Sequence, residues 1–368
     1  MIPISKPFLG KLEKKYLNEA LDSGWISSKG DFLNKFEIEF SNYIGSKHCI
    51  TTSNGTVAIH LALLAMGIGD GDEVILPDLT FVASANGIVH SGAKPIIADI
   101  NIRDWCLDVN SIINKITNKT KAIMPVHIYG YPVDMQKVME IANEYNLLII
   151  EDVAEAHGAT FKDQKLGSFG DTSTFSFFAN KIITSGEGGC VLTNNDDIAS
   201  EARFLRDHAM DKNKKFWHPK VGYNYRMTNL QAAIACAQLE QIDFFLEERN
   251  TILNTYRQEL RNLNINLNPE SENSKSVNWL TSITILDENI SRDGMMAHLY
   301  MKGIEVRPFF EPLSNLPMYD NNNFSHSNSN HISKIGINLP TYIGLEKNKI
   351  KFICDSIKEY IDNENKKN

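Results

Sequence analysis

A single lysine stands where an amine could act as a nucleophile. In FSFFANKIITSGEGG, residues 175–189, Lys181 lies between a strand-like segment and a Gly-rich turn. The flanking residues are apolar: Phe177, Phe178, Ile182 and Ile183. An apolar environment favours the neutral amine of a lysine, which can attack an aldehyde. An exposed loop charge is the ordinary alternative for a lone lysine.

A carboxylate follows an apolar strand upstream of this lysine. Asp152 ends the run NLLIIED and should emerge at the carboxyl edge of a sheet, where α/β proteins bind ligands. A carboxylate there can keep a pyridine nitrogen protonated, so that the ring accepts electrons from a carbanion. A helix N-cap or a loop carboxylate is the alternative. Glu151 should point to the opposite side of the strand, which favours Asp152.

Three further segments could bind a phosphorylated aromatic ring. SNGT, residues 53–56, lies between a strand and an apolar helix, so its N–H groups and the Thr56 hydroxyl could receive a phosphate. Ser176 could add a second hydroxyl, and Phe81 follows the strand EVILP and could lie flat on a ring. A capped turn and a core aromatic are the alternatives. The order of Asp152, Ser176 and Lys181 after a phosphate turn is more specific than any one of them.

The elements that must position these residues alternate along the chain. Residues 48–200 combine short apolar runs with helical patterns, including a helix near 134–146, which predicts an α/β protein with a mostly parallel sheet covered by helices. Residues 229–260 predict a long helix or a helix pair leading out of this domain. We therefore expect a large domain at 1–245 and a smaller α/β domain at 246–368, with the N-terminal segment packed against the small domain.

Two polar stretches belong to the predicted second domain. NPESENSKS, residues 268–276, is expected to be a turn or linker, after which strand character resumes. The Asn/Ser/His segment at 320–331 is expected to be a mobile loop rather than a metal site, because His326 and His331 have no further ligands nearby in the sequence.

The composition of the chain indicates which kinds of partner the protein binds and in which cellular compartment it works. The chain has 368 residues, 42% hydrophobic content and a net charge of -8, which argues against a general nucleic-acid or acidic-membrane binder. Its five cysteines show no metal-ligand spacing and are typical of reduced thiols. Neither a secretory signal nor an apolar run of membrane-spanning length is evident. A soluble cytoplasmic protein that acts on small molecules is expected.

Taken together, these segments resemble the fold type I pyridoxal phosphate (PLP) enzymes, and within them the DegT/StrS sugar aminotransferase family. The resemblance covers nearly the whole chain. The segments that support it are SNGTVAIHLAL, GDEVILPDLTFVAS, KAIMPVHIYG, IIEDVAEAHGA, GSFGDTSTFSFFANKIITSGEGG and GYNYRMTNLQAAI.

This resemblance implies a role for each matched residue. Lys181 would hold PLP covalently and move a proton between the amino-acid Cα and the cofactor, and Asp152 would pair with the ring nitrogen. The remaining cofactor residues would be Gly55, Thr56 and Ser176 at the phosphate and Phe81 against the ring. In the family a neighbouring subunit supplies an asparagine to the phosphate, here Asn224, so a homodimer with shared active sites is implied.

A narrower resemblance concerns the amino acceptor. WISSKG, WHPKVGYNYRMTN and RPFFEPL resemble members that aminate C4 of GDP-4-keto-6-deoxymannose with L-glutamate, for O-antigen and other surface polysaccharides. The residues expected to contact the nucleotide-linked sugar are Trp25, Lys29, Lys220, Arg226 and Arg307. The chain departs from its relatives by having Ser314 and, at 277–278, Val-Asn where histidines are common. A dTDP- or UDP-linked acceptor, a PLP-dependent sugar dehydratase and a PLP-binding regulator stay open as alternatives.

Overall fold

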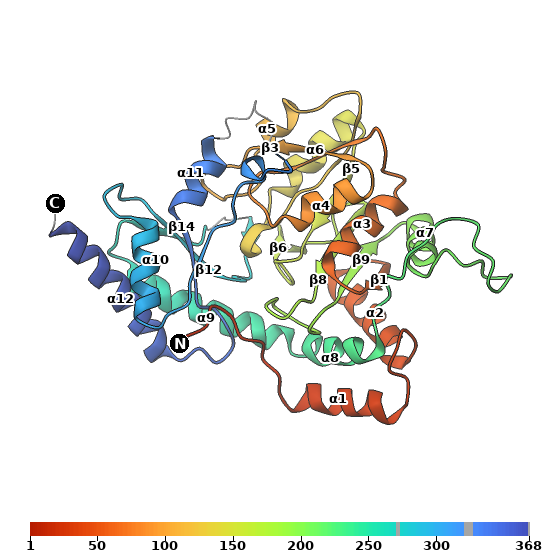
Figure 1. Ribbon diagram of the computed structural model, residues 1–368, viewed down its shortest axis with the longest axis horizontal. Coiled ribbons are helices and arrows are strands. Elements are labelled where there is room, and N and C mark those ends of the chain that lie inside the picture. Colours follow the sequence, from red (N-terminus) through yellow and green to blue (C-terminus); the bar gives the residue numbers. More distant parts are fainter. Residues whose placement is uncertain (270–272, 320–326, 367–368) are drawn as a thin grey trace.

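A seven-stranded sheet forms the centre of the molecule in the computed structural model, which describes residues 1–269, 273–319 and 327–366 (Figure 1). Its strands are β1 (His48–Thr52), β2 (Glu73–Pro77), β3 (Lys94–Ala98), β4 (Thr120–Ile123), β5 (Leu148–Asp152), β8 (Thr172–Ser176) and β9 (Gly189–Thr193). They lie in the order β1-β9-β8-β5-β4-β2-β3. Of the seven strands, only β9 runs opposite to the other six, so the mostly parallel sheet is confirmed.

Helices cover both faces of this sheet. They are α1 (Lys11–Asp22), α2 (Asp31–Ile44), α3 (Gly55–Ala65), α4 (Ala83–His90), α5 (Val109–Ile113), α6 (Met135–Tyr145), α7 (Asp196–Arg206) and α8 (Asn229–Leu239), with the 3-10 turn η1 at Ile128–Gly130. Buried side chains of α2, α6 and α8 pack on one face, and those of α3, α4 and α7 pack on the other. This two-sided burial explains the continuous apolar runs in strands such as β2 and β5.

A second, antiparallel sheet follows in the chain. It consists of β10 (Ile265–Leu267), β12 (Thr281–Ile285), β14 (Gly336–Leu339) and β13 (Arg307–Pro308), in that order. The helices α9 (Ile242–Leu260), α10 (Arg292–Met301) and α12 (Lys347–Asn365) bury apolar side chains against it. Smaller elements are β6 (Thr160–Phe161), β7 (Gln164–Lys165), β11 (Ser274–Lys275), η2 (Leu313–Asn315) and α11 (Ser327–Ile335).

The helix α9 connects the two sheets. Phe245, near its start, belongs to the core of the first sheet, whereas Ile252 and Tyr256 belong to that of the second. A domain boundary between residues 245 and 246 therefore falls inside a continuous helix, and the division stays a prediction. The N-terminal segment reaches the second sheet's side, where Ile2 pairs with Ile304.

The predicted loop at 320–331 is wrong over its last residues. Residues 327–331 form the start of α11, while 320–326 lie outside the described residues. The carboxylate of Asp99, which follows β3, accepts the N–H groups of Asn328 (3.3 Å) and Ser329 (3.1 Å). The first N–H groups of α11 are thus bound by a carboxylate from another part of the chain, and such a helix start leaves no signal in the local sequence.

The predicted linker at 268–276 includes residues 270–272, which also lie outside the described part, and β11 follows them. Over the described ranges, the structure contains no helix long and apolar enough to cross a membrane.

Candidate active site

Of the predicted cofactor residues, all but Asn224 come together in one pocket of about 590 Å³. It lies at the carboxyl ends of β2, β4, β5 and β8, the edge at which parallel sheets bind ligands. Its lining includes Lys181, Asp152, Gly55, Thr56, Phe81 and Ser176. Residues more than 120 positions apart in the sequence thus share one cavity.

Asp152 is the last residue of β5 and is buried. Its Oδ2 accepts a hydrogen bond from Ser84 Oγ of α4 at 2.7 Å, and its Oδ1 accepts one from Ala154 N at 3.1 Å. These bonds fix the orientation of the carboxylate. Because each carboxylate oxygen has two lone pairs, Asp152 can still accept a hydrogen bond from a protonated ring nitrogen.

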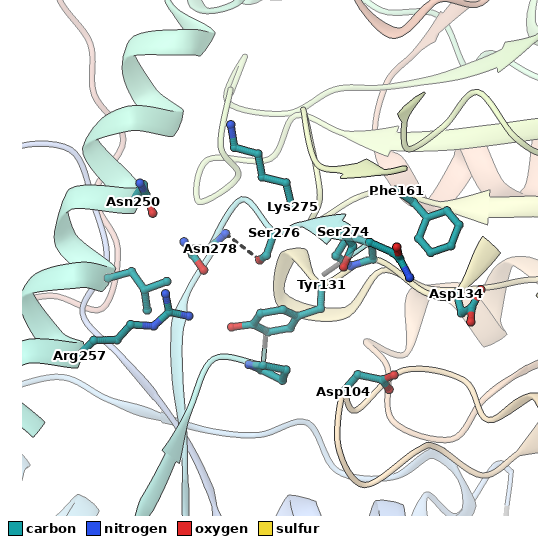
Figure 2. Close-up of a pocket in the computed structure, with 14 residues that line it drawn as sticks. Asp104, Tyr131, Asp134, Phe161, Asn250, Arg257, Ser274, Lys275, Ser276 and Asn278 are labelled. Carbon is teal, nitrogen blue, oxygen red and sulfur yellow. Dashed lines mark hydrogen bonds between the residues drawn. The ribbon is translucent and has the colours of Figure 1, made fainter. Parts of the chain in front are cut away.

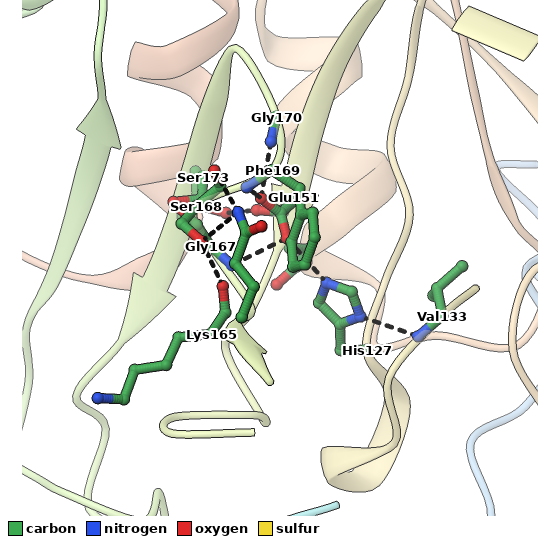
Figure 3. A network of polar contacts seen from close by, with 12 residues as sticks. His127, Val133, Glu151, Lys165, Gly167, Ser168, Phe169, Gly170 and Ser173 are labelled. Atoms are coloured by element: carbon green, nitrogen blue, oxygen red, sulfur yellow. Dashed lines mark hydrogen bonds and ion pairs between the residues drawn. The ribbon is translucent and has the colours of Figure 1, made fainter. Parts of the chain in front are cut away.

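Glu151 points to the opposite face of β5, as strand alternation predicts. Figure 3 shows its carboxylate surrounded by the loop before β8, where it accepts the N–H groups of Gly167 (2.8 Å), Phe169 (2.8 Å) and Gly170 (2.9 Å). His127 faces it at 3.4 Å through Nε2, while His127 Nδ1 accepts the N–H of Val133. The carboxylate of Glu151 therefore holds the loop at 167–170 against the sheet.

The phosphate end of the pocket is formed by α3 and β8. The side chain of Asn54 caps α3 by accepting the N–H of Val57 at 3.0 Å, which starts the helix at Gly55. A Cβ added to Gly55 would lie 2.8 Å from Ser176 Cβ, so glycine permits this close approach. The first N–H groups of a helix have no acceptor within the helix and favour an anion. Helix start and hydroxyl together suit a phosphate.

Lys181 is held between a carboxylate and an aromatic ring. Its Nζ lies 3.6 Å from Glu155 Oε1 and 4.2 Å from the centre of the Trp279 ring. The indole Nε1 donates to Asn180 O at 2.7 Å, which fixes the ring next to the lysine. Only 11% of the lysine side chain is exposed, as the apolar flanking residues suggested.

Neither Glu155 nor Trp279 was singled out from the sequence. Glu155 lies three residues after Asp152, in the turn that leaves the same strand edge, and this spacing was an available signal. Trp279 is about 100 positions from the lysine; it stands just before β12 of the second sheet, and its side chain is buried in the core of the first. Phe81 is half-exposed at the pocket and contacts Phe310, with ring centres 5.6 Å apart.

The residues expected to contact the sugar nucleotide are not gathered in this pocket. Arg307 lines it, but Trp25 lines a separate pocket with Tyr16, and Lys29 and Arg226 line a third. Lys220 is exposed and pairs with Glu201 at 2.8 Å. Within one chain, therefore, only one of the five adjoins the candidate catalytic lysine.

Asn224 is exposed and lies outside the pocket of its own chain. Arg226 Nε donates to Asn224 Oδ1 at 3.0 Å, while the same guanidinium contacts Asp207 (2.7 Å) and His208 (3.2 Å). Because the guanidinium holds the amide oxygen, the Asn224 NH₂ group is directed away from Arg226 and can act as a donor.

The positions that the resemblance singled out as departures also lie elsewhere. Ser314 is buried and donates to Asp78 through both its N–H (2.8 Å) and its hydroxyl (2.9 Å). Asn278 lines another pocket, of about 490 Å³. Figure 2 shows it there together with Tyr131 and Arg257. Neither Ser314 nor Asn278 lines the cavity that contains Lys181.

Comparisons with known proteins decide the family. Residues 7–358 match the model of the DegT/DnrJ/EryC1/StrS aminotransferase family. The chain belongs to this family. GDP-perosamine synthase of Vibrio cholerae is 47% identical over 98% of this chain and 100% of that protein, and GDP-perosamine synthase of Escherichia coli O157:H7 is 45% identical over 98% of each chain.

A solved structure agrees in fold and in cofactor. The PLP-form of a protein described as the sugar aminotransferase Spr1654 of Streptococcus pneumoniae has a TM-score of 0.92, with 26% identity over 99% of each chain. The chain is thus a PLP-dependent aminotransferase of fold type I. The residues present fit the cofactor, because lysine, a buried carboxylate, a helix start and a half-exposed aromatic ring meet in the same cavity.

Proposed function

We propose that this enzyme transfers the amino group of L-glutamate to C4 of GDP-4-keto-6-deoxymannose and thereby forms GDP-perosamine. The observation that supports the transfer chemistry is the meeting of Lys181, Asp152 and the start of α3 in one pocket. The GDP sugar is supported by three relatives named GDP-perosamine synthase, which are 44–47% identical over nearly the whole chain. A role in surface-polysaccharide synthesis follows from this product.

Each pocket residue has a task in this proposal. PLP supplies an electron-accepting ring that stabilises negative charge next to the reacting nitrogen. Asp152 keeps the ring nitrogen protonated, and Lys181 holds the cofactor and then moves a proton at the Cα of the amino donor. The helix start at Gly55 and Thr56, with Ser176, would receive the phosphate, and Phe81 would contact the ring.

A homodimer is part of the proposal. Asn224, held by Arg226, presents its NH₂ group on the surface, where it is available to the phosphate site of a second copy. Lys29, Lys220, Arg226 and Trp25 are proposed to contact the nucleotide in the dimer, with Arg307 at the sugar. A cytoplasmic location is proposed as well, supported by five free, buried cysteines, because reducing compartments keep thiols unpaired.

The acceptor is tested with the purified holoenzyme and glutamate. We expect kcat/KM to be higher for GDP-4-keto-6-deoxymannose than for dTDP-4-keto-6-deoxyglucose, because a site that hydrogen-bonds one base discriminates against another. The amino-sugar products are identified by mass spectrometry. A preference for the dTDP sugar would overturn the acceptor assignment and leave the aminotransferase chemistry in place.

A further inference from the structure

We propose that Glu155 is the counter-charge of Lys181, stabilising the ammonium form that the lysine takes on when its amine receives a proton during amino transfer. Glu155 Oε1 lies 3.6 Å from Lys181 Nζ, and the two side chains are 6% and 11% exposed. This inference deepens the proposed function, on which it rests for the reaction that delivers the proton. Glu155 is a positioning and charge-stabilising residue that acts on the reacting amine.

The peptide of Tyr129 fixes the orientation of Glu155. Its N–H donates to Glu155 Oε2 at 2.8 Å, which leaves Oε1 directed at the lysine. Tyr129 has φ of +51°, a conformation that non-glycine residues adopt only where their surroundings impose it. The fully buried ring stays in place because its hydroxyl accepts the N–H of Phe310 at 2.9 Å. The fold thus holds Tyr129 in a strained backbone conformation, and the N–H group of this residue donates to the Glu155 carboxylate.

The proton balance of the step requires such a charge. A C–H bond at the Cα of the amino donor breaks, its electron pair stays with the bound donor, and the proton adds to Lys181 Nζ. The amine becomes positive and is neutral again once it passes the proton on. Because the side chains of Lys181 and Glu155 are both largely buried, a fixed carboxylate stabilises that transient charge more than the same group would in solvent. Glu155 itself gains and loses no proton.

Burial raises the pKa of Glu155, and the nearby charge of Asp152 raises it further, while Lys181 and the Tyr129 N–H act in the opposite direction. Arg307 is a further charged group in the same pocket lining. As pH falls through this raised pKa, Glu155 becomes neutral and its stabilisation of the ammonium ion disappears. The counter-charge is therefore lost at a higher pH than for an ordinary surface glutamate.

Glu155→Gln tests the proposal while keeping the shape of the side chain, because the amide oxygen can still accept the Tyr129 N–H. We expect kcat with saturating glutamate to fall by about tenfold to a hundredfold with little change in KM. The acid limb of the kcat–pH profile should disappear. In the substrate-free holoenzyme, the pH midpoint of the cofactor's visible absorbance change should move to lower pH, because the protonated Lys181 nitrogen has lost its negatively charged partner.

Glu144→Gln, on the exposed side of α6, is the matched control and should change neither readout. If Glu155→Gln does not retain PLP, Glu155→Asp is titrated instead, and its midpoint should move in the same direction by less. An unchanged absorbance midpoint and an unchanged kcat–pH profile would overturn the proposal. The absorbance titration contains no sugar, so failure of the GDP sugar as acceptor is distinguished from failure of this assignment.

Discussion

At the scale of single residues, neighbouring carboxylates on β5 have different tasks because a strand directs successive side chains to opposite faces. Asp152 faces α4 and the pocket, whereas Glu151 faces the loop at 167–170. Glu151 accepts hydrogen bonds from three backbone N–H groups, and these bonds hold its carboxylate on the face of the sheet opposite the cofactor pocket.

Asp152→Asn should lower kcat by several powers of ten, because a neutral amide cannot keep the ring nitrogen protonated and each tenfold corresponds to about 1.4 kcal/mol. Cofactor affinity should change less, since the phosphate contacts remain. Steady-state kinetics and equilibrium dialysis of PLP measure the two effects. Asp197→Asn, at an exposed position of α7, is the control. Near-normal turnover of Asp152→Asn would show that another acid pairs with the ring.

At the scale of elements, the site depends on how closely the start of α3 approaches the end of β8. This approach requires glycine at position 55, where a Cβ would meet Ser176 Cβ at 2.8 Å. Asn54 caps the helix from its own end, so the first turn is held by a local bond and by a tertiary contact.

Gly55→Ala should displace the start of α3 from Ser176 and weaken retention of the cofactor phosphate. We expect the dissociation constant of PLP to rise by about tenfold to a hundredfold, since each tenfold corresponds to about 1.4 kcal/mol of binding free energy. Gly10→Ala is a suitable control, because its Cβ would make only ordinary contacts, the nearest at 3.4 Å. Unaltered PLP affinity in Gly55→Ala would place the phosphate elsewhere.

At the scale of the whole molecule, the proposed dimer explains the dispersed sugar-nucleotide residues. Asn224 lies on the surface, with its amide oriented by Arg226 and the guanidinium held by Asp207. A surface amide fixed in this way is suited to a site on a second copy.

Mixing Lys181→Ala and Asn224→Ala dimers should restore activity that each lacks alone. In a heterodimer, one site combines an intact Lys181 with an intact Asn224 from the other chain, so statistical exchange should recover about a quarter of the wild-type sites. Glutamate-dependent turnover is followed as exchange proceeds, with native mass spectrometry to verify the heterodimers. Complete exchange without recovery would mean that Asn224 acts on its own subunit.

Much of the fold follows from the sequence, because apolar runs and helical periodicity both depend on residues that are close together in the chain. The apolar runs and the helical periods between them predict the seven strands of the central sheet, β1 to β5, β8 and β9, and the pair α8 and α9. The same periodicity places Asp152 at a strand end, the structure ends β8 at Ser176, and parallel strands bring their carboxyl ends to one edge. Lys181, in the turn after β8, joins them for this reason.

Tertiary packing alone decided the rest. Glu155 becomes the partner of Lys181 only because the buried Tyr129 peptide holds its other oxygen, and Trp279 reaches the lysine from the second sheet's segment of the chain. The start of α11 is satisfied by Asp99, more than 200 residues earlier. The sequence by itself determined where strands end and turns begin, since these positions depend on residues that are neighbours in the chain. Contacts between distant segments depend on the packed core, because burial selects partners that no local pattern identifies.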